Sequence, residues 1–328
     1  FHQLEASPLN SSLMLLKNIT ISGLGGVGGY YGAMLVEAAR REGLGRTISF
    51  VARGAHRAAI EERGLHVHTP ERDFTVRPDY LAEDPHDLPP TDLLILATKS
   101  YDLEANIQQL RPIITPRTII LPLLNGADIT DQIQVLLPEA RVWDGCVYIS
   151  GRKPTAGEIL LEAEREIFLF GSRGAERSAE ERELFALLES VGVHVVNPDD
   201  IEESIRKKFL MISATATGTS YYNMTVGEAL ASHPVEMRGL IEELCTLFSA
   251  LGHDLGEGAV ERTVERQTFM IPSSTSSMHV DFMAGSSTEL ENLTGYVVRA
   301  ARRIGLELPL YERMYKALAT EPYPLKHD

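Results

Sequence analysis

The feature that most constrains the fold is an apolar segment that runs directly into a glycine-rich turn. Residues 19–22 (ITIS) predict a β-strand, the turn follows the pattern G-x-G-x-x-G, and residues 29–41 predict a helix. In such a unit the first glycine permits a tight turn, the second lets backbone amides approach a pyrophosphate, and the third lets the helix pack on the sheet. Helix N-termini also attract anions. At the start of an alternating chain, the pattern predicts a dinucleotide site formed by Gly23, Leu24, Gly25, Gly26, Val27 and Gly28.

The first half of the chain alternates strand-like and helix-like segments. Short β-branched apolar runs predict buried parallel strands at 19–22, 47–51, 92–97 and 118–121. Helical patterns lie between them at 29–41, 56–63 and 103–110. Residues 146–171 resemble an antiparallel pair with a turn at 154–157, followed by a helix at 178–191 and a strand at 193–197. This order predicts a Rossmann-type, doubly wound α/β sheet.

The pattern changes at residue 201. Strand signals end, and helical patterns follow at 201–211, 234–251, 259–267 and 288–304. The residues NPDD at 197–200 provide a turn and a helix N-cap, which marks a domain boundary. We therefore expect an N-terminal extension at 1–17, a Rossmann domain at 18–199 and an all-helical C-terminal domain at 200–328.

Charge and composition exclude several classes of function. The 328 residues carry a net charge of −15, which argues against a nucleic-acid or anionic-membrane partner, because both require a basic face. The two cysteines, Cys146 and Cys245, have neither metal-ligand nor disulfide spacing and are typical of a reducing cytoplasm. No signal peptide or membrane-spanning run is evident. We expect a cytoplasmic protein without a metal.

Polar side chains follow three of the predicted strands. Arg53 follows the second strand, where an NAD site would place an acidic residue for the ribose 2′-OH; an arginine favours the 2′-phosphate of NADP(H). Lys99 and Asn125 end the next two strands, at the edge where open α/β sheets bind ligands. Each residue has an ordinary alternative: a solvated surface arginine, a solvated lysine at a strand end, or an Asn-Gly turn. Their shared position with the glycine turn favours the functional interpretation.

Five blocks of the chain resemble, in order, the 2-dehydropantoate 2-reductase (ketopantoate reductase) family. They are GLGGVGGYYGAML, FVARGAHRAAIEERGL, DLLILATKSYDLE, LPLLNGAD and TSSMHVDFMAGSSTELENLTGYVVRAARRIGLELP. The resemblance covers residues 18–318. It implies reduction of a 2-oxo acid to a 2-hydroxy acid with NADPH, with 2-dehydropantoate as the first candidate substrate in pantothenate and coenzyme A synthesis. It also implies a Rossmann domain followed by a helical domain.

The resemblance assigns roles to individual residues. The glycine turn, Arg53, Lys99 and Asn125 correspond to cofactor-binding positions, and Asn125 also to a substrate-binding position. The catalytic lysine, expected at the first helical position of the second domain, corresponds to Lys208, with Lys207 as the alternative. Ser277 corresponds to a substrate-binding serine and Glu289 to an active-site glutamate.

The expected reaction gives these residue types a chemical reason. Hydride addition to a ketone develops negative charge on oxygen, which a fixed cation such as Lys208 stabilises and protonates. Glu289 is expected to balance the charge of the lysine and to accept a hydrogen bond from the substrate hydroxyl. On composition alone, a solvated ion pair would be the simpler interpretation of both residues.

The chain departs from the family in the substrate site. The family carries asparagines four and eight residues after the lysine, where this chain has Ile212 and Ala216, and Val226 replaces a third asparagine. Loss of three amides should alter specificity, because buried polar groups discriminate between substrates. Two explanations remain open. Either the substrate is a different, more apolar 2-oxo acid, or nearby polar side chains take over, namely Ser213, Thr215, Thr217 and Asn223.

Two other functions fit parts of the pattern. A β-hydroxyacid dehydrogenase also combines a Rossmann domain with a helical lysine, but it usually carries an asparagine where this chain has Ile212. A non-catalytic NADPH-binding regulator would keep the fold and lose the substrate pocket. The apolar helices of the second domain suit either a core or a dimer interface, so a homodimer remains open.

Overall fold

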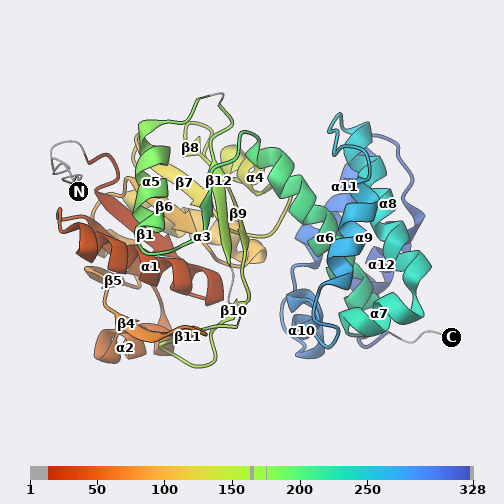
Figure 1. Cartoon of the computed structure of the whole chain (residues 1–328), viewed down its shortest axis with the longest axis horizontal. Helices are drawn as coiled ribbons and strands as arrows, with labels where there is room; N and C mark the ends of the chain where they lie inside the picture. Colours follow the sequence, from red (N-terminus) through yellow and green to blue (C-terminus); the bar gives the residue numbers. More distant parts are fainter. Residues whose placement is uncertain (1–13, 163–165, 175, 326–328) are drawn as a thin grey trace, which may run out of the picture. The chain divides into compact units, whose positions relative to one another are not determined.

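The structure is a computed structural model that describes residues 14–162, 166–174 and 176–325 (Figure 1). The chain divides into two compact units. An α/β unit contains the residues up to 98, 102–124 and 130–201, and a helical unit contains 99–101, 125–129 and the residues from 202 onward. The expected N-terminal extension lies outside the described residues except for 14–17. The expected boundary at 199/200 stays a prediction.

The α/β unit is built on a six-stranded parallel sheet. In spatial order its strands are β5 (Tyr80–Ala82), β2 (Thr47–Val51), β1 (Asn18–Ser22), β6 (Leu93–Leu96), β7 (Ile119–Pro122) and β8 (Arg141–Val142). The predicted Rossmann-type sheet is confirmed. Strands β5 and β8 were not predicted, because strands of 3 and 2 residues carry no periodic signal. The register pairs Ser22 with Val51 and Leu96, so the carboxyl ends of β1, β2 and β6 lie level.

The helices of the α/β unit lie between its strands along the chain. They are α1 (Gly26–Glu42), α2 (Gly54–Arg63), α3 (Leu103–Leu110), α4 (Ile129–Leu136) and α5 (Ala179–Glu189), with short 3₁₀ turns at Pro85–Asp87, Ser100–Asp102 and Arg111–Ile113. Helix α1 begins three residues before the expected start at Gly29, because the glycine turn itself enters the helix. The sequence analysis missed α4.

Two smaller sheets complete the α/β unit (Figure 1). One contains β10 (Gly151–Arg152), β11 (Glu158–Leu161), β3 (Leu65–His68) and β4 (Asp73–Val76); the other contains β13 (Val195–Val196), β12 (Ile167–Gly171) and β9 (Asp144–Tyr148). Strands β10 and β11 form an antiparallel hairpin, and β9 and β12 are also antiparallel. The antiparallel stretch expected at 146–171 therefore exists, but its strands belong to two sheets.

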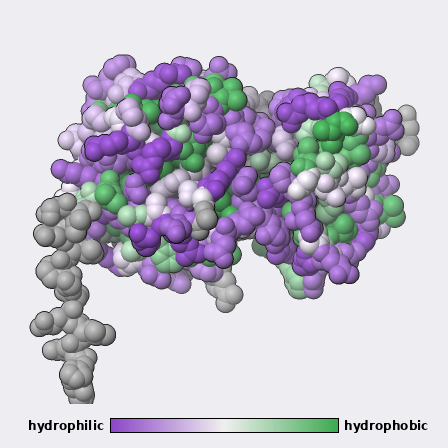
Figure 2. All heavy atoms as spheres, turned by 90° about the horizontal axis from the view of Figure 1, so that it is seen from above, coloured by the Kyte–Doolittle hydropathy of each residue, from purple (hydrophilic) through white to green (hydrophobic). Residues whose placement is uncertain are grey.

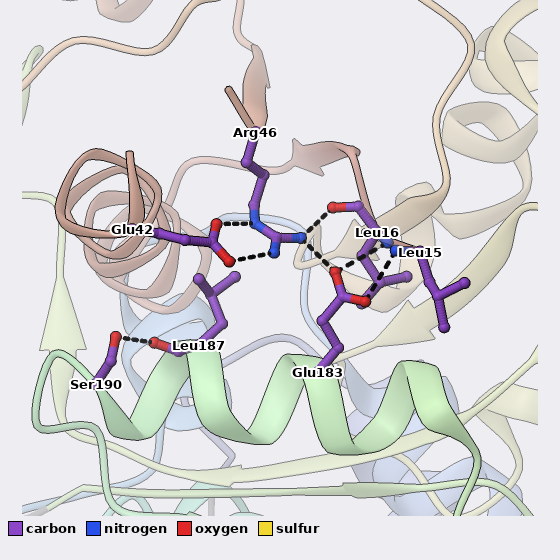
Figure 3. A network of polar contacts seen from close by, with 7 residues as sticks. All are labelled: Leu15, Leu16, Glu42, Arg46, Glu183, Leu187 and Ser190. Atoms are coloured by element: carbon purple, nitrogen blue, oxygen red, sulfur yellow. Dashed lines mark hydrogen bonds and ion pairs between the residues drawn. The ribbon is translucent and has the colours of Figure 1, made fainter. Parts of the chain in front are cut away.

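A buried ion-pair network anchors the segment that precedes β1 (Figure 3). The side chain of Arg46 is 1% exposed and donates to Glu42 at 2.8 Å, to Glu183 at 2.8 Å and to the Leu16 carbonyl. Glu183 in turn accepts from the backbone N–H groups of Leu15 and Leu16 at 2.9 and 3.1 Å. Burial disfavours the Arg46 cation, but the two carboxylates outweigh burial and raise its pKa. The network thus joins α1, α5 and the start of the sheet.

The helical unit is confirmed as all-helical over its described residues. It contains α6 (Ile201–Tyr222), α7 (Val226–Ser232), α8 (Pro234–Ala250), α9 (Ala259–Thr268), α10 (Ser277–Met283), a π-helical turn (Glu291–Gly295), α11 (Tyr296–Arg303) and α12 (Pro309–Thr320). Helix α6 is longer than expected, and Lys208 lies well inside it, so the prediction of a first helical position is wrong. The helices at 226–232, 277–283 and 309–320 were not predicted.

The surface is mostly hydrophilic in the view of Figure 2, with separate hydrophobic patches. Within the described ranges, every helix is too short or too polar to cross a lipid bilayer.

Candidate functional site

The glycine turn connects the end of β1 to the start of α1. Gly23 has a φ of +94°, and a Cβ placed there would lie 2.5 Å from the backbone of Ala97. A Cβ on Gly28 would lie 2.0 Å from the Gly23 carbonyl oxygen, whereas a Cβ on Gly25 meets nothing within 4 Å. The protein's own packing therefore requires the outer two glycines but not Gly25. Open space at the N-cap of a helix fits the approach of a phosphate to the backbone.

A cavity of about 250 Å³ opens beside this turn. Arg53, the exposed N-cap residue of α2, lies on its wall together with Gly23 and Gly25. The structure thus brings the predicted phosphate turn and the predicted 2′-phosphate arginine to one pocket. The rest of the lining is Ser22, Leu24, Val51, Ala52, His56, Glu83, Thr98, Asp102, Ala105, Asn106, Gln109 and Lys153.

Several lining residues were not predicted from the sequence, among them His56 and Lys153. His56 lies on α2, three residues after Arg53, and is 9% exposed. Lys153 lies on the turn of the β10–β11 hairpin. His56 could have been predicted from the sequence, because it lies in the first turn of α2 together with Arg53. Nothing in the sequence indicates Lys153, because a hairpin one hundred residues away reaches the pocket only through tertiary packing.

The helical unit holds further predicted site residues in two sets of polar contacts. Lys208 of α6 donates a hydrogen bond to the Asn125 side-chain oxygen at 2.8 Å. Lys99 donates to Asp281 of α10 at 3.1 Å, and its ammonium lies 3.7 Å from the carboxylate of Glu289. The side chain of Glu289 is 4% exposed. All of these residues belong to the helical unit, although Lys99 and Asn125 follow strands of the sheet.

Glu289 balances the charge of Lys99, a pairing that the sequence analysis did not anticipate. It also accepts from the Ser100 N–H at 3.3 Å. Burial disfavours the Lys99 ammonium, but the charge of Glu289 and the hydrogen bond to Asp281 outweigh burial and raise the pKa of Lys99. Lys99 therefore remains a cation at neutral pH.

The structure separates the two candidate lysines of α6. Lys207 pairs with Glu203, one turn earlier on the helix, at 2.5 Å. Lys208 is half-buried and reaches Asn125. Of the two lysines, Lys208 is therefore the one whose ammonium contacts another predicted site residue.

Ser277 is the exposed first residue of α10, and the preceding Ser276 caps the helix by accepting from the His279 N–H at 3.1 Å. Asp281 follows Ser277 by four residues, which places both on one helix face. Since Asp281 binds Lys99, Ser277 lies one helical turn before a residue that contacts Lys99. Asp281 was not predicted, although its position four residues after Ser277 could have indicated it.

The three apolar replacements lie in different environments. Ile212, one turn after Lys208 on α6, is half-buried at the edge of the helical core. Ala216 and Val226 are 2% and 1% exposed. Of the three replacements, Ile212 is therefore the one that is not fully buried.

Most of the polar neighbours that could compensate already have partners inside the helical unit. Ser213 is fully buried and bonds the Tyr311 hydroxyl at 2.9 Å and the Leu293 carbonyl at 3.0 Å. The Thr217 hydroxyl bonds that of Thr294 at 2.8 Å. The Thr215 hydroxyl accepts from Gln267, and the Asn223 oxygen lies 2.9 Å from a ring nitrogen of His279. Because these side chains already bond to each other or to neighbours inside the helical unit, they are less available to replace the missing amides in binding a substrate.

Comparison with known proteins matches nearly the whole chain to one family. The family model described as "Ketopantoate reductase PanE/ApbA" matches residues 19–173, and its C-terminal counterpart matches residues 182–321. The chain is similar to the crystal structure of 2-dehydropantoate 2-reductase from Porphyromonas gingivalis W83, with 42% identity, a TM-score of 0.83, and coverage of 92% of this chain and 99% of that one.

Two further relatives differ in what their names state. An uncharacterised oxidoreductase, YkpB, from Bacillus subtilis (strain 168) is 28% identical over 300 residues, which cover 91% of this chain and 96% of the relative. A D-mandelate dehydrogenase solved with NADH and anilino(oxo)acetate is 20% identical, with a TM-score of 0.79 and coverage of 92% and 97%, and shares the fold.

Proposed function

Because the chain belongs to the ketopantoate reductase family of NAD(P)-dependent oxidoreductases, we propose that it reduces a 2-oxo acid to a 2-hydroxy acid with NADPH. The observation that carries the proposal is that two predicted cations of the helical unit have fixed partners: Lys208 donates to Asn125, and Lys99 lies beside the buried Glu289. A solvated helix-face ion pair would need neither the burial of Glu289 nor the bond to Asn125.

The proposed cofactor site is the glycine turn with Arg53. The turn and the N-terminus of α1 would hold the pyrophosphate, and Arg53 would bind the 2′-phosphate through charge-assisted hydrogen bonds. When bound, NADPH supplies the hydride. A pocket with an arginine rather than a carboxylate after β2 favours NADPH over NADH.

In the proposed reaction, Lys208 stabilises the negative charge that develops on the carbonyl oxygen and donates the proton to it. Positioned acid catalysis of this kind contributes about 10²–10⁴ in rate. Asn125 fixes the position of the Lys208 ammonium. Glu289 fixes the position of Lys99 and accepts a hydrogen bond from a substrate hydroxyl. Ser277 is proposed to bind the substrate carboxylate.

Two substrates are proposed. The first is 2-dehydropantoate, which the name of the 42% identical Porphyromonas gingivalis structure supports. The second is a more apolar branched 2-oxo acid. It is favoured by the half-buried isoleucine at position 212 and by the internal partners of Ser213 and Thr217.

The test is NADPH oxidation followed over a panel of branched 2-oxo acids and repeated with NADH. We expect Lys208→Met to reduce kcat at least about 10²-fold, because it removes the proton donor. Lys207→Met, the matched control one residue away, should retain most of the activity. Full activity of Lys208→Met would show that the catalytic assignment is wrong. Binding of NADPH without turnover of any 2-oxo acid would instead favour a non-catalytic regulator.

Strong and selective turnover of 2-dehydropantoate would exclude the apolar substrate. The homodimer and the cytoplasmic location remain predictions, which light scattering of the purified protein and imaging of the tagged chain in cells would test.

A further inference from the structure

The β10–β11 hairpin packs directly on the first turn of α1. A Cβ on Gly26 would lie 2.0 Å from the Gly151 carbonyl oxygen, where β10 begins. A Cβ on Gly29 would lie 2.4 Å from the side chain of Ile159, which belongs to β11. The hairpin itself therefore requires that Gly26 and Gly29 carry no side chain. Their effect is to hold the hairpin beside the phosphate turn.

His56 fixes the other end of the same hairpin. Its Nδ1 accepts a hydrogen bond from the Gly157 N–H, at the end of the hairpin turn, at 2.9 Å. An accepting Nδ1 requires the neutral ring with its proton on Nε2. Burial lowers the pKa of His56, the charge of Lys153 lowers it further, and the Leu24 carbonyl opposes both. His56 thus joins α2 to the hairpin turn, on the wall of the cavity that Lys153 also lines.

Lys153 therefore lies on the wall of the same cavity as Arg53. The two residues come from different sheets, because Lys153 follows β10 and Arg53 follows β2. A phosphate monoester carries about −1.5 to −2 charges at neutral pH. Arg53 supplies a single positive charge, and the cavity wall also carries Glu83 and Asp102. Arg53 alone therefore leaves part of the phosphate charge unbalanced, which a second cation would complement. A lysine at a hairpin turn supplies a flexible point charge for this role.

We propose that Lys153 is a specificity-determining residue that binds the 2′-phosphate of the cofactor together with Arg53. The proposal rests on the proposed use of NADPH. The hairpin is then a second wall of the cofactor site, held by His56 and by the glycines of α1. The alternative is a solvated lysine on an exposed turn.

The test is isothermal titration of NADPH and of NADH into Lys153→Gln and the wild type, which measures binding without turnover. We expect the Kd for NADPH to rise about tenfold, the loss of one charge-assisted contact. The Kd for NADH should change less than about twofold, because NADH lacks the phosphate. Arg152→Gln is the matched control. Its side chain is a neighbour on the hairpin that pairs with Glu162 at 2.7 Å, and its loss should leave both Kd values unchanged.

Three outcomes would overturn the proposal. An unchanged Kd for NADPH in Lys153→Gln would identify Lys153 as a solvated side chain. An equal loss of affinity for both cofactors would show that Lys153 acts on the shared part of the dinucleotide or on the hairpin. An Arg152→Gln variant as weak as Lys153→Gln would show a general charge effect. A wild type that binds NADH more tightly than NADPH would refute the proposed cofactor instead, before any variant is examined.

Discussion

Replacing Gly25 by alanine should separate cofactor binding from folding. Gly25 has φ −79° and ψ −161°, an extended conformation that alanine adopts without strain, and its Cβ would enter open space. Alanine restricts the unfolded chain, which stabilises by about 0.4–1 kcal/mol. It is a poorer N-cap than glycine by a similar amount, about 0.5–1 kcal/mol. The two effects offset each other, so the free energy of unfolding should change by less than about 1 kcal/mol.

The effect on cofactor binding should be much larger. A methyl group at Gly25 occupies the space through which backbone N–H groups would reach the pyrophosphate. A hydrogen bond to a charged group contributes about 1.5–3 kcal/mol. Loss of one such bond predicts an NADPH affinity weaker by about 10–150-fold.

Gly28→Ala is the matched comparison in the same turn. Its Cβ would lie 2.0 Å from the Gly23 oxygen and 2.8 Å from the Ala97 Cβ. Neither neighbour can move freely, so overpacking should lower the free energy of unfolding by about 1–3 kcal/mol. Urea denaturation measures stability, and NADPH fluorescence titration measures affinity. A Gly25→Ala variant that binds NADPH within twofold of the wild type would refute the phosphate site at this turn.

Three further predictions concern buried and half-buried side chains. Arg46→Met should lower the free energy of unfolding in urea by about 3–5 kcal/mol, because Glu42 and Glu183 lose their shared cation; a loss below about 1 kcal/mol would show that the network is dispensable. Burial raises the pKa of Glu166 above 4.5, so the folded state holds this proton to a higher pH than the unfolded chain. The free energy of unfolding should therefore fall as the pH rises from 4.5 to the folded-state pKa of Glu166. Glu166→Gln should flatten this fall in urea denaturation at several pH values, and an unchanged slope would show that Glu166 does not cause it. Ile212→Asn should raise kcat/KM for 2-dehydropantoate relative to apolar 2-oxo acids about five- to tenfold, the contribution of one hydrogen bond; an unchanged ratio would place Ile212 outside the pocket.

Local patterns in the sequence determined the parallel sheet and the phosphate turn. Apolar runs such as residues 47–51 and 103–110 coincide with β2 and α3, because burial of both strand faces and one helix face follows from the order of residues alone. The glycine turn could be predicted equally well, since its strand, turn and helix are consecutive in the sequence. Short elements such as β8 and α7 carry too few residues for a period to be detected.

Tertiary structure alone decided how the site residues are grouped. The sequence placed Lys99 and Asn125 at strand ends, but only the packing of the helical unit gave them Glu289 and Lys208 as partners. It also brought Lys153 to the cavity of Arg53, since the hairpin rests on α1 through close glycine contacts. Contacts between residues a hundred positions apart depend on how whole elements pack, and no local pattern encodes them. The sequence by itself determined the fold class and the cofactor turn, and the tertiary structure decided which charges meet.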